Sequence, residues 1–147
     1  MGYLATKIGV DGPVIDLTVW IGPARAATLQ AAGRQVPGPA TIRALVDTGA
    51  DRTAIDLAVV RSLGLTHHNQ ALLHSSAAGT RAIPADTYIA QLVLGGLQAA
   101  PFPGWREVQV VGVSVVKQGA LALVGRDLLD SCLVVYDGRA RTFALAY

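Results

Sequence analysis

One short segment limits most strongly how this chain can fold. The apolar residues Ala44–Val46 run directly into Asp47, Thr48 and Gly49, and a second apolar run follows at 53–55. Buried strands favour such runs, whereas an ionisable carboxylate among them costs free energy unless it is paired or has a task. A glycine permits a tight turn with positive φ. The segment therefore predicts two buried strands joined by a loop that presents Asp47.

An ordinary hairpin turn is the simpler interpretation of the Asp-Thr-Gly triplet when it is considered alone. The triplet occurs only once, and no internal repeat supplies a second copy. A second motif, Leu123–Leu129, lies near the C-terminus and reads Leu-Val-Gly-Arg-Asp-Leu-Leu. The two motifs together favour a functional loop over a plain turn.

Size and composition favour one all-β domain that spans residues 1–147. A chain of 147 residues can bury a core without disulfides or metal. Hydrophobic residues make up 52% of the chain and charged residues 15%, which argues against disorder and leaves apolar surface for a subunit interface. Short runs rich in Val, Ile, Thr and Leu are separated by glycine and proline, a pattern typical of strands and turns.

Alternation and turn signals predict where the elements lie. Asp56 is expected to cap a short helix that Gly64 ends, and one further helical turn is expected near Asp127. The segment 21–40 is predicted to be a loop insertion with one or two helical turns, 65–69 a polar turn, and 101–105 a turn-rich link. Strands are predicted over Val14–Trp20, Thr41–Val46, Thr53–Ile55, Ile83–Leu94, Val108–Val116, Leu121–Val124, Leu133–Tyr136 and Thr142–Ala146.

Several functions are disfavoured by the sequence. The net charge is +2 without a basic cluster, so we expect no nucleic-acid partner. We also expect no membrane partner and a cytoplasmic location, because no apolar run could span a bilayer and the N-terminus lacks a secretory pattern. Cys132, the only cysteine, reads as a buried strand thiol. No cofactor motif is present, and His67, His68 and His74 read as surface residues rather than as a metal site.

The two motifs together resemble the retropepsin-like aspartic proteases, the retroviral-type, single-domain branch of the pepsin clan. The run from Asp47 to Asp51 matches the active-site loop of that family, and Thr53 stands at the position where the family's motif also has its residue after that loop. Gly125, Arg126 and the residues after them match its second motif. The resemblance implies an all-β, closed or pseudo-barrel acid protease fold with one or two short helices, assembled as a two-fold homodimer.

That resemblance implies how the site would work. Aspartic proteolysis needs two carboxylates that share one proton around a water molecule. Since the chain has one Asp-Thr-Gly, each protomer of the homodimer would supply one catalytic Asp47. Thr48 would hydrogen-bond across the two-fold axis, and Gly49 would lie beside the substrate backbone. The substrate would be a peptide or protein.

Supporting roles follow from the same resemblance. Ala50, Asp51 and Gly79 would contact the substrate, with Gly79 at or near the tip of a flap hairpin at about 72–88. Arg126 and Asp127 would support the loop, with Arg126 holding the carboxylate of Asp51. Apolar substrate pockets would be lined by Leu45, Ala54, Leu121 and Leu123, for which an ordinary core position is an equal alternative.

Ala50 bears on the pH dependence of activity. A serine or threonine at this place would donate a hydrogen bond that stabilises the ionised pair of carboxylates, and alanine cannot. We therefore expect activity at mildly acidic to near-neutral pH. The chain departs from the retroviral pattern in its longer 21–40 segment and in a hairpin with fewer glycines.

A non-catalytic function is the alternative. A protein with the same fold could serve as a dimerisation or peptide-binding module, because a fold does not determine a function. The intact Asp47, Thr48 and Gly49 favour the enzyme, since a binding module has no reason to keep an acid at a two-fold axis.

Overall fold

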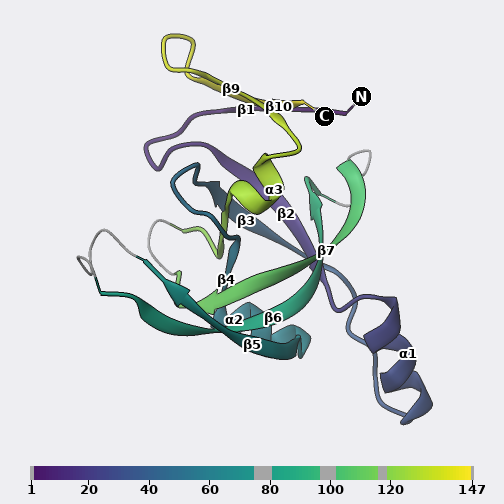
Figure 1. The fold of residues 1–147 in the computed structure, drawn as a ribbon. Helices are drawn as coiled ribbons and strands as arrows, with labels where there is room; N and C mark the ends of the chain where they lie inside the picture. The colour runs from purple at the N-terminus through teal and green to yellow at the C-terminus, as the bar shows by residue number, and fades with distance from the viewer. Residues whose placement is uncertain (1, 75–80, 97–101, 116–118, 147) are drawn as a thin grey trace.

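A closed barrel of β-strands encloses many of the buried apolar side chains. The computed structural model describes residues 2–74, 81–96, 102–115 and 119–146. The strand order is β2-β3-β8-β4-β7-β6, and pairing of β2 with β6 closes the barrel (Figure 1). These strands are β2 (Val14–Trp20), β3 (Ala40–Val46), β4 (Ala54–Asp56), β6 (Ile83–Leu94), β7 (Phe102–Val113) and β8 (Ala122–Val124). The predicted all-β barrel class is confirmed.

The parallel pairs of this barrel lie next to the Asp47 loop. β3 and β8 run parallel, with Val46 opposite Val124, and β4 runs parallel to β7. β4 also pairs antiparallel with β8. Ala44, Ile55 and Val124 on these strands are fully buried. The strands that enter and leave the loop are therefore held on both sides by a rigid, buried part of the barrel.

A long hairpin extends from the barrel. β5 (Thr66–Leu73) pairs antiparallel with β6, from Thr66 opposite Ile89 to Leu73 opposite Ile83. The described residues of the range predicted for a flap are 72–74 and 81–88, and the first strand begins earlier, at Thr66. Gly79, predicted at the tip, lies outside the described residues.

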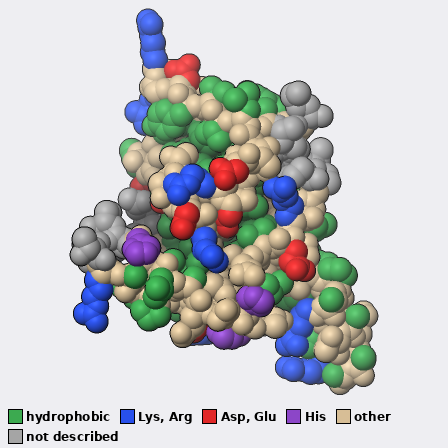
Figure 2. Space-filling view, viewed as in Figure 1, with side chains coloured by type: hydrophobic (Ala, Val, Ile, Leu, Met, Phe, Trp, Pro, Cys, Tyr) green, Lys and Arg blue, Asp and Glu red, His purple; other side chains and the backbone are tan. Residues whose placement is uncertain are grey.

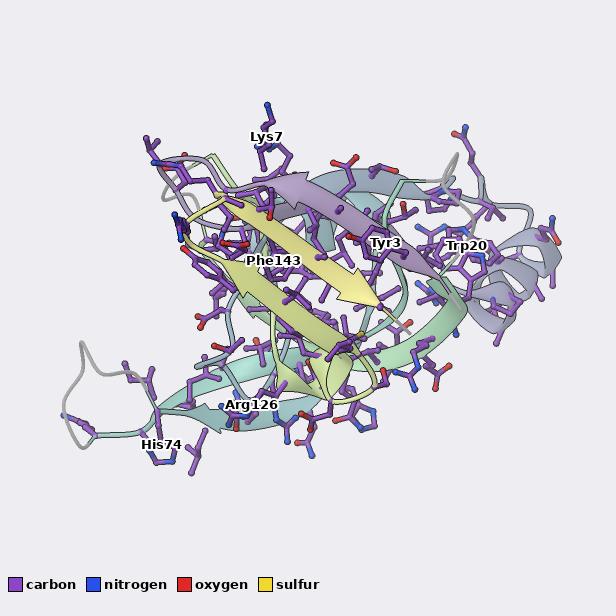
Figure 3. The ribbon with its side chains drawn as sticks, turned by 90° about the horizontal axis from the view of Figure 1, so that it is seen from above. Tyr3, Lys7, Trp20, His74, Arg126 and Phe143 are labelled. Atoms are coloured by element: carbon purple, nitrogen blue, oxygen red, sulfur yellow. The ribbon has the colours of Figure 1, made fainter. Side chains whose placement is uncertain are left out.

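The two ends of the chain meet in a separate sheet. β10 (Thr142–Ala146) pairs with β1 (Tyr3–Lys7) on one side and with β9 (Leu133–Asp137) on the other. Figure 3 looks onto this sheet, which lies above the barrel in Figure 1. Phe143 and Leu145 of β10 are buried against the core, whereas Tyr3 and Leu133 are largely exposed on its outer face.

Three helices accompany the strands in the described part of the chain. They are α1 (Pro23–Ala31), α2 (Leu57–Leu63) and α3 (Arg126–Leu129). The predicted caps of α2 are confirmed: Oδ1 of Asp56 accepts a hydrogen bond of 2.8 Å from the backbone N–H of Ala58, and Gly64 ends the helix at φ 63°. Among the described helices, none is long and apolar enough to cross a bilayer.

The structure differs from the sequence analysis in four places. The segment 21–40 contains a nine-residue helix, α1, rather than one or two turns, because Pro23 suits the first helical position and the alanines that follow favour a helix. β1 was not predicted, since its pairing with β10 rather than its apolar content defines it. The predicted polar turn at 65–69 and the link at 101–105 largely belong to β5 and β7, where cross-strand pairing overrides weak local preference.

Candidate active site

Asp47 sits at the point where β3 leaves the barrel. Its backbone N–H donates to the carbonyl of Val124 at 2.9 Å, and its own carbonyl accepts from the N–H of Ala50 at 3.2 Å. The first bond continues the parallel β3–β8 pairing, and the second closes a tight turn. The backbone at Asp47 is thus fixed on one side by the sheet and on the other by the turn, as the sequence predicts.

Gly49 packs closely against Asp47 but has no unusual backbone angle. Its N–H donates to Oδ1 of Asp47 at 2.9 Å, and a Cβ at Gly49 would lie 3.1 Å from the same oxygen. Gly49 is not among the glycines with positive φ, contrary to the sequence prediction. A side chain at this position would therefore require the carboxylate to shift by a few tenths of an ångström.

Arg126 braces the loop, but through different partners from those predicted. Its Nη1 donates to the carbonyl oxygens of Thr48 at 3.0 Å and Gly49 at 3.4 Å, and its backbone N–H donates to the carbonyl of Ala50 at 2.9 Å. Among the residues that the structure describes, the carboxylate of Asp51 forms no ion pair with Arg126. The predicted Asp51–Arg126 pair is therefore wrong, because the guanidinium reaches the carbonyl groups of the turn instead.

Asp127 joins α3 to the strand that leaves the loop. Its Oδ2 accepts from the backbone N–H of Thr53 at 2.8 Å, and its Oδ1 accepts from Oγ1 of the same threonine at 2.7 Å. Oγ1 of Thr53, which is fully buried, accepts in turn from the N–H of Gly125 at 3.1 Å. Oδ1 also accepts from the N–H of Leu128 at 2.9 Å, at the start of α3, as predicted for a carboxylate there.

We expect Asp127→Ala to destabilise the fold by about 3 kcal/mol, because Thr53 would keep a buried N–H and hydroxyl without their charged acceptor. Urea unfolding measures the loss. Asp130→Ala is the matched control, since its exposed carboxylate makes no hydrogen bond or ion pair in the described structure, and we expect a change below about 0.5 kcal/mol. Equal losses in the two variants would contradict the role given to Asp127.

The apolar residues predicted for the substrate pockets lie side by side. Leu123 on β8 faces Leu45 of β3 on one side and Ala54 of β4 on the other. Leu45, Leu121 and Leu123 are half-buried, whereas Ala54 is buried. Three of the four residues therefore form one row across adjacent strands, next to the loop.

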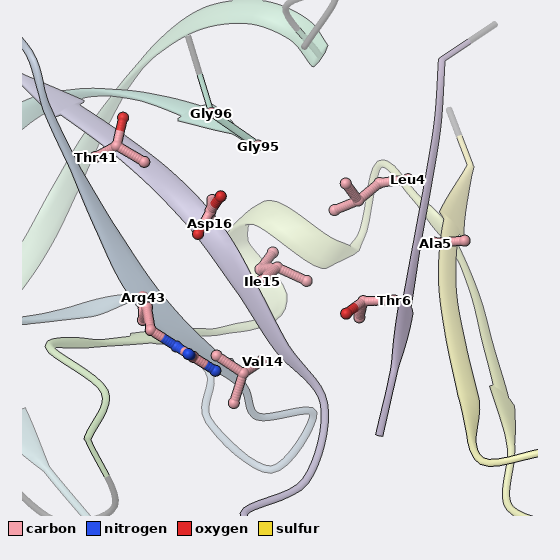
Figure 4. A pocket seen from close by; sticks show the side chains of 10 residues that line it. All are labelled: Leu4, Ala5, Thr6, Val14, Ile15, Asp16, Thr41, Arg43, Gly95 and Gly96. Atoms are coloured by element: carbon pink, nitrogen blue, oxygen red, sulfur yellow. The ribbon is translucent and has the colours of Figure 1, made fainter. Parts of the chain in front are cut away.

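The loop lies at the surface of the single chain. Asp47 and Ala50 are half-buried, and Thr48, Gly49 and Asp51 are exposed. Figure 2 shows acidic and basic side chains gathered at the centre of this face. A cavity of about 730 Å³ lies elsewhere, between β1 and β2, lined by residues that include Thr6, Asp16 and Arg43 (Figure 4). Asp47 is not among the residues that line that cavity.

Ionisable groups away from the loop are shifted for identifiable reasons. Hydrogen bonds from Gln70 at 3.1 Å and His67 at 3.3 Å lower the pKa of Asp86 on the β5–β6 hairpin. Partial burial raises the pKa of the Cys132 thiol. Within the described ranges, no group of three or more His, Cys, Asp or Glu side chains is arranged to hold a metal ion.

Two residues of the site were not given roles by the sequence. Thr53 was recognised only as part of the motif, and Gly125 only as the residue before Arg126. A Cβ at Gly125 would lie 2.6 Å from the backbone carbon and oxygen of Arg52, so the two motifs touch at this glycine. A glycine directly before the Arg-Asp pair was the only sequence signal for this contact.

Comparison with known proteins gives a family match in sequence and a similar fold. Residues 27–121 match the sequence model of a family described as aspartyl protease, which is well over half of the chain. The structure resembles a retropepsin-like aspartic protease from Rickettsia conorii with a TM-score of 0.55 and 14% identity, over 98% of this chain and 90% of that chain. An aspartic proteinase from Irpex lacteus matches with a TM-score of 0.49 and 16% identity, over 99% of this chain and 47% of that chain. No curated protein sequence matches.

Proposed function

This chain belongs to the aspartyl protease family and has a retropepsin-like fold, and we propose that it is an endopeptidase whose active site forms between two copies. The observation that carries the proposal is the Asp47 loop. It presents one carboxylate at the surface, held by Gly49 and braced by Arg126. The family relation and this geometry support hydrolysis of peptide bonds.

The proposed chemistry needs two copies of Asp47. One carboxylate, ionised, accepts a proton from the water that attacks the scissile carbonyl carbon, while the protonated carboxylate of the second copy donates to the carbonyl oxygen. The tetrahedral diol then collapses as the amide nitrogen receives a proton, and an acid and an amine are released. Each chain has one Asp-Thr-Gly, so the second carboxylate comes from a second chain.

Two features support assembly of a homodimer at the loop. Thr48 is exposed, and its hydroxyl makes no hydrogen bond in the described part of the chain, so it is free to bond to a second loop across a two-fold axis. The terminal sheet offers two edge strands, β1 and β9, whose outer backbone groups can pair with another copy. Leu133 and Val135 on β9 add exposed apolar area beside that edge.

The proposed substrate is an extended peptide with apolar side chains on both sides of the cleaved bond. The half-buried Leu45, Leu121 and Leu123 line its pockets, and Ala50 and Asp51 contact its backbone. The β5–β6 hairpin acts as a flap over the bound peptide. Residues 21–40 form an insertion within one protease domain of residues 1–147.

Incubation of the purified protein with a mixed peptide library, followed by mass spectrometry, tests this function. We expect cleavage of internal bonds with apolar residues on both sides, at mildly acidic to near-neutral pH. A dimer that cleaves no peptide at any pH would contradict the proposal. Peptide binding without cleavage would instead identify the alternative, a binding module with this fold.

We expect Thr48→Val to raise the dissociation constant of the dimer about tenfold, because the substitution removes the hydroxyl from both copies but keeps the side-chain shape. Sedimentation over a range of concentrations measures the dissociation constant. Thr66→Val is the matched control, since Thr66 is exposed on β5 and its hydroxyl has no bond in the described structure. The same dissociation constant for both variants would argue against contact between the two loops.

A further inference from the structure

A second cavity, far from the Asp47 loop in the fold, lies between α1 and the C-terminal end of α2. Its volume is about 450 Å³, and its lining includes the three arginines Arg25, Arg34 and Arg61 but no acidic residue. Figure 2 shows basic side chains gathered beside α1. We refer to this cavity as the arginine pocket.

The backbone around the arginine pocket is held in place by hydrogen bonds. The N–H of Arg34 donates to the carbonyl of Leu29 at 2.8 Å and so fixes the end of α1. The N–H of Gly64 donates to the carbonyl of Arg61 at 3.2 Å at the end of α2. Nε1 of Trp20 donates to the carbonyl of Pro37 at 3.0 Å and anchors the segment after α1. The backbone that carries the three arginines is therefore held in place, and the side chains of Arg34 and Arg61 are exposed to solvent.

The three guanidinium groups have no counter-charge within bonding distance. Among the described residues, the ion pair is His67–Asp86, and Arg25, Arg34 and Arg61 donate no side-chain hydrogen bond. Nε of Arg25 is buried and has no acceptor among those residues, which costs free energy. Glu107 lines an adjacent cavity with Arg25 but accepts a hydrogen bond from Gln91 at 3.4 Å.

Helix dipoles explain only part of this arrangement. Arg61 lies in the last turn of α2, where a positive charge is favoured, whereas Arg34 lies beyond the last turn of α1. Arg25, however, lies in the first turn of α1, where the dipole opposes a positive charge, and that turn contains no acid. A ligand with negative charge would stabilise all three side chains at once.

We propose that the arginine pocket binds a compact phosphate-bearing small molecule with at least two negative charges. A guanidinium can donate two parallel hydrogen bonds to phosphate oxygens, and a phosphate group has enough oxygens and charge for several arginines. A single carboxylate carries one charge and two oxygens, so it would leave the positive charge of the pocket largely uncompensated. The volume lies in the range of small-molecule sites.

Thermal unfolding in the presence of inorganic phosphate, pyrophosphate and citrate, at constant ionic strength, tests the proposal. We expect a saturable rise in Tm with pyrophosphate, a weaker one with phosphate, and the weakest with citrate. Arg61→Gln should raise the pyrophosphate Kd at least about tenfold. Arg139→Gln removes the same charge from an exposed turn and should leave the Kd unchanged.

Arg61→Lys tests whether Arg61 binds the ligand or only stabilises the end of α2. It keeps the positive charge at the end of α2, so the Tm without ligand should stay the same, but it loses the two-pronged donor and should raise the Kd severalfold. No saturable shift with either phosphate ligand would overturn the proposal. Equal Kd values for Arg61→Gln and Arg139→Gln would do the same, as would citrate binding more tightly than pyrophosphate. None of these readouts depends on peptide cleavage.

Discussion

Asp47→Asn is expected to lower the rate of peptide cleavage by at least about 10³-fold without loss of the fold. Asparagine can neither accept the proton of the attacking water nor supply one to the scissile carbonyl. Its side-chain oxygen can still accept the hydrogen bond from Gly49, which is the contact that holds this side chain. We therefore expect the free energy of unfolding to change by less than about 0.5 kcal/mol.

Initial rates on one cleaved peptide, measured with urea unfolding and sedimentation of the same preparations, check this prediction. Asp11→Asn is the control, because it makes the same chemical change at an exposed residue outside the loop. We expect it to retain full activity. A dimeric Asp47→Asn variant that cleaves as fast as the control would remove Asp47 from the mechanism.

Gly125→Ala is expected to damage both stability and activity. The new Cβ would lie 2.6 Å from the backbone carbon and oxygen of Arg52, a distance that real Cβ atoms essentially never show. The backbone cannot move aside as a flexible side chain could, so the loop or α3 must shift. Such overpacking costs about 1–3 kcal/mol, and displacement of the loop would lower the cleavage rate further.

Gly38→Ala is the matched control for this substitution. Gly38 has no positive φ, and a Cβ there would meet no atom within 4 Å. We expect its free energy of unfolding and its cleavage rate to stay near those of the wild type. If Gly125→Ala also behaved as the wild type, the close contact between the two motifs would not be needed to hold the loop.

The sequence predicted the parts of the fold that depend on local chemistry. Asp56 and Gly64 specify the ends of α2 because a carboxylate accepts free N–H groups and glycine tolerates a left-handed backbone. The placement of Asp47 followed from the apolar run before it, which is typical of a buried strand. The alternating residues of Val14–Trp20 likewise gave the bounds of β2.

Long-range contacts could not be predicted in the same way. Thr53 and Asp127 are 74 residues apart, and no local pattern records that one binds the other. Arg126 binds the carbonyl of Thr48 rather than the carboxylate of Asp51. This depends on the path of the loop, which the motif does not specify. β1 is defined by its pairing with β10 at the other end of the chain.

Cleavage rate per chain, measured as the protein is diluted through its dimer dissociation constant, tests the central claim most directly. If each active site needs Asp47 from two copies, the rate per chain must fall in step with the fraction of dimer determined by sedimentation at the same concentrations. A rate per chain that stays constant while the protein dissociates into monomers would contradict a shared active site.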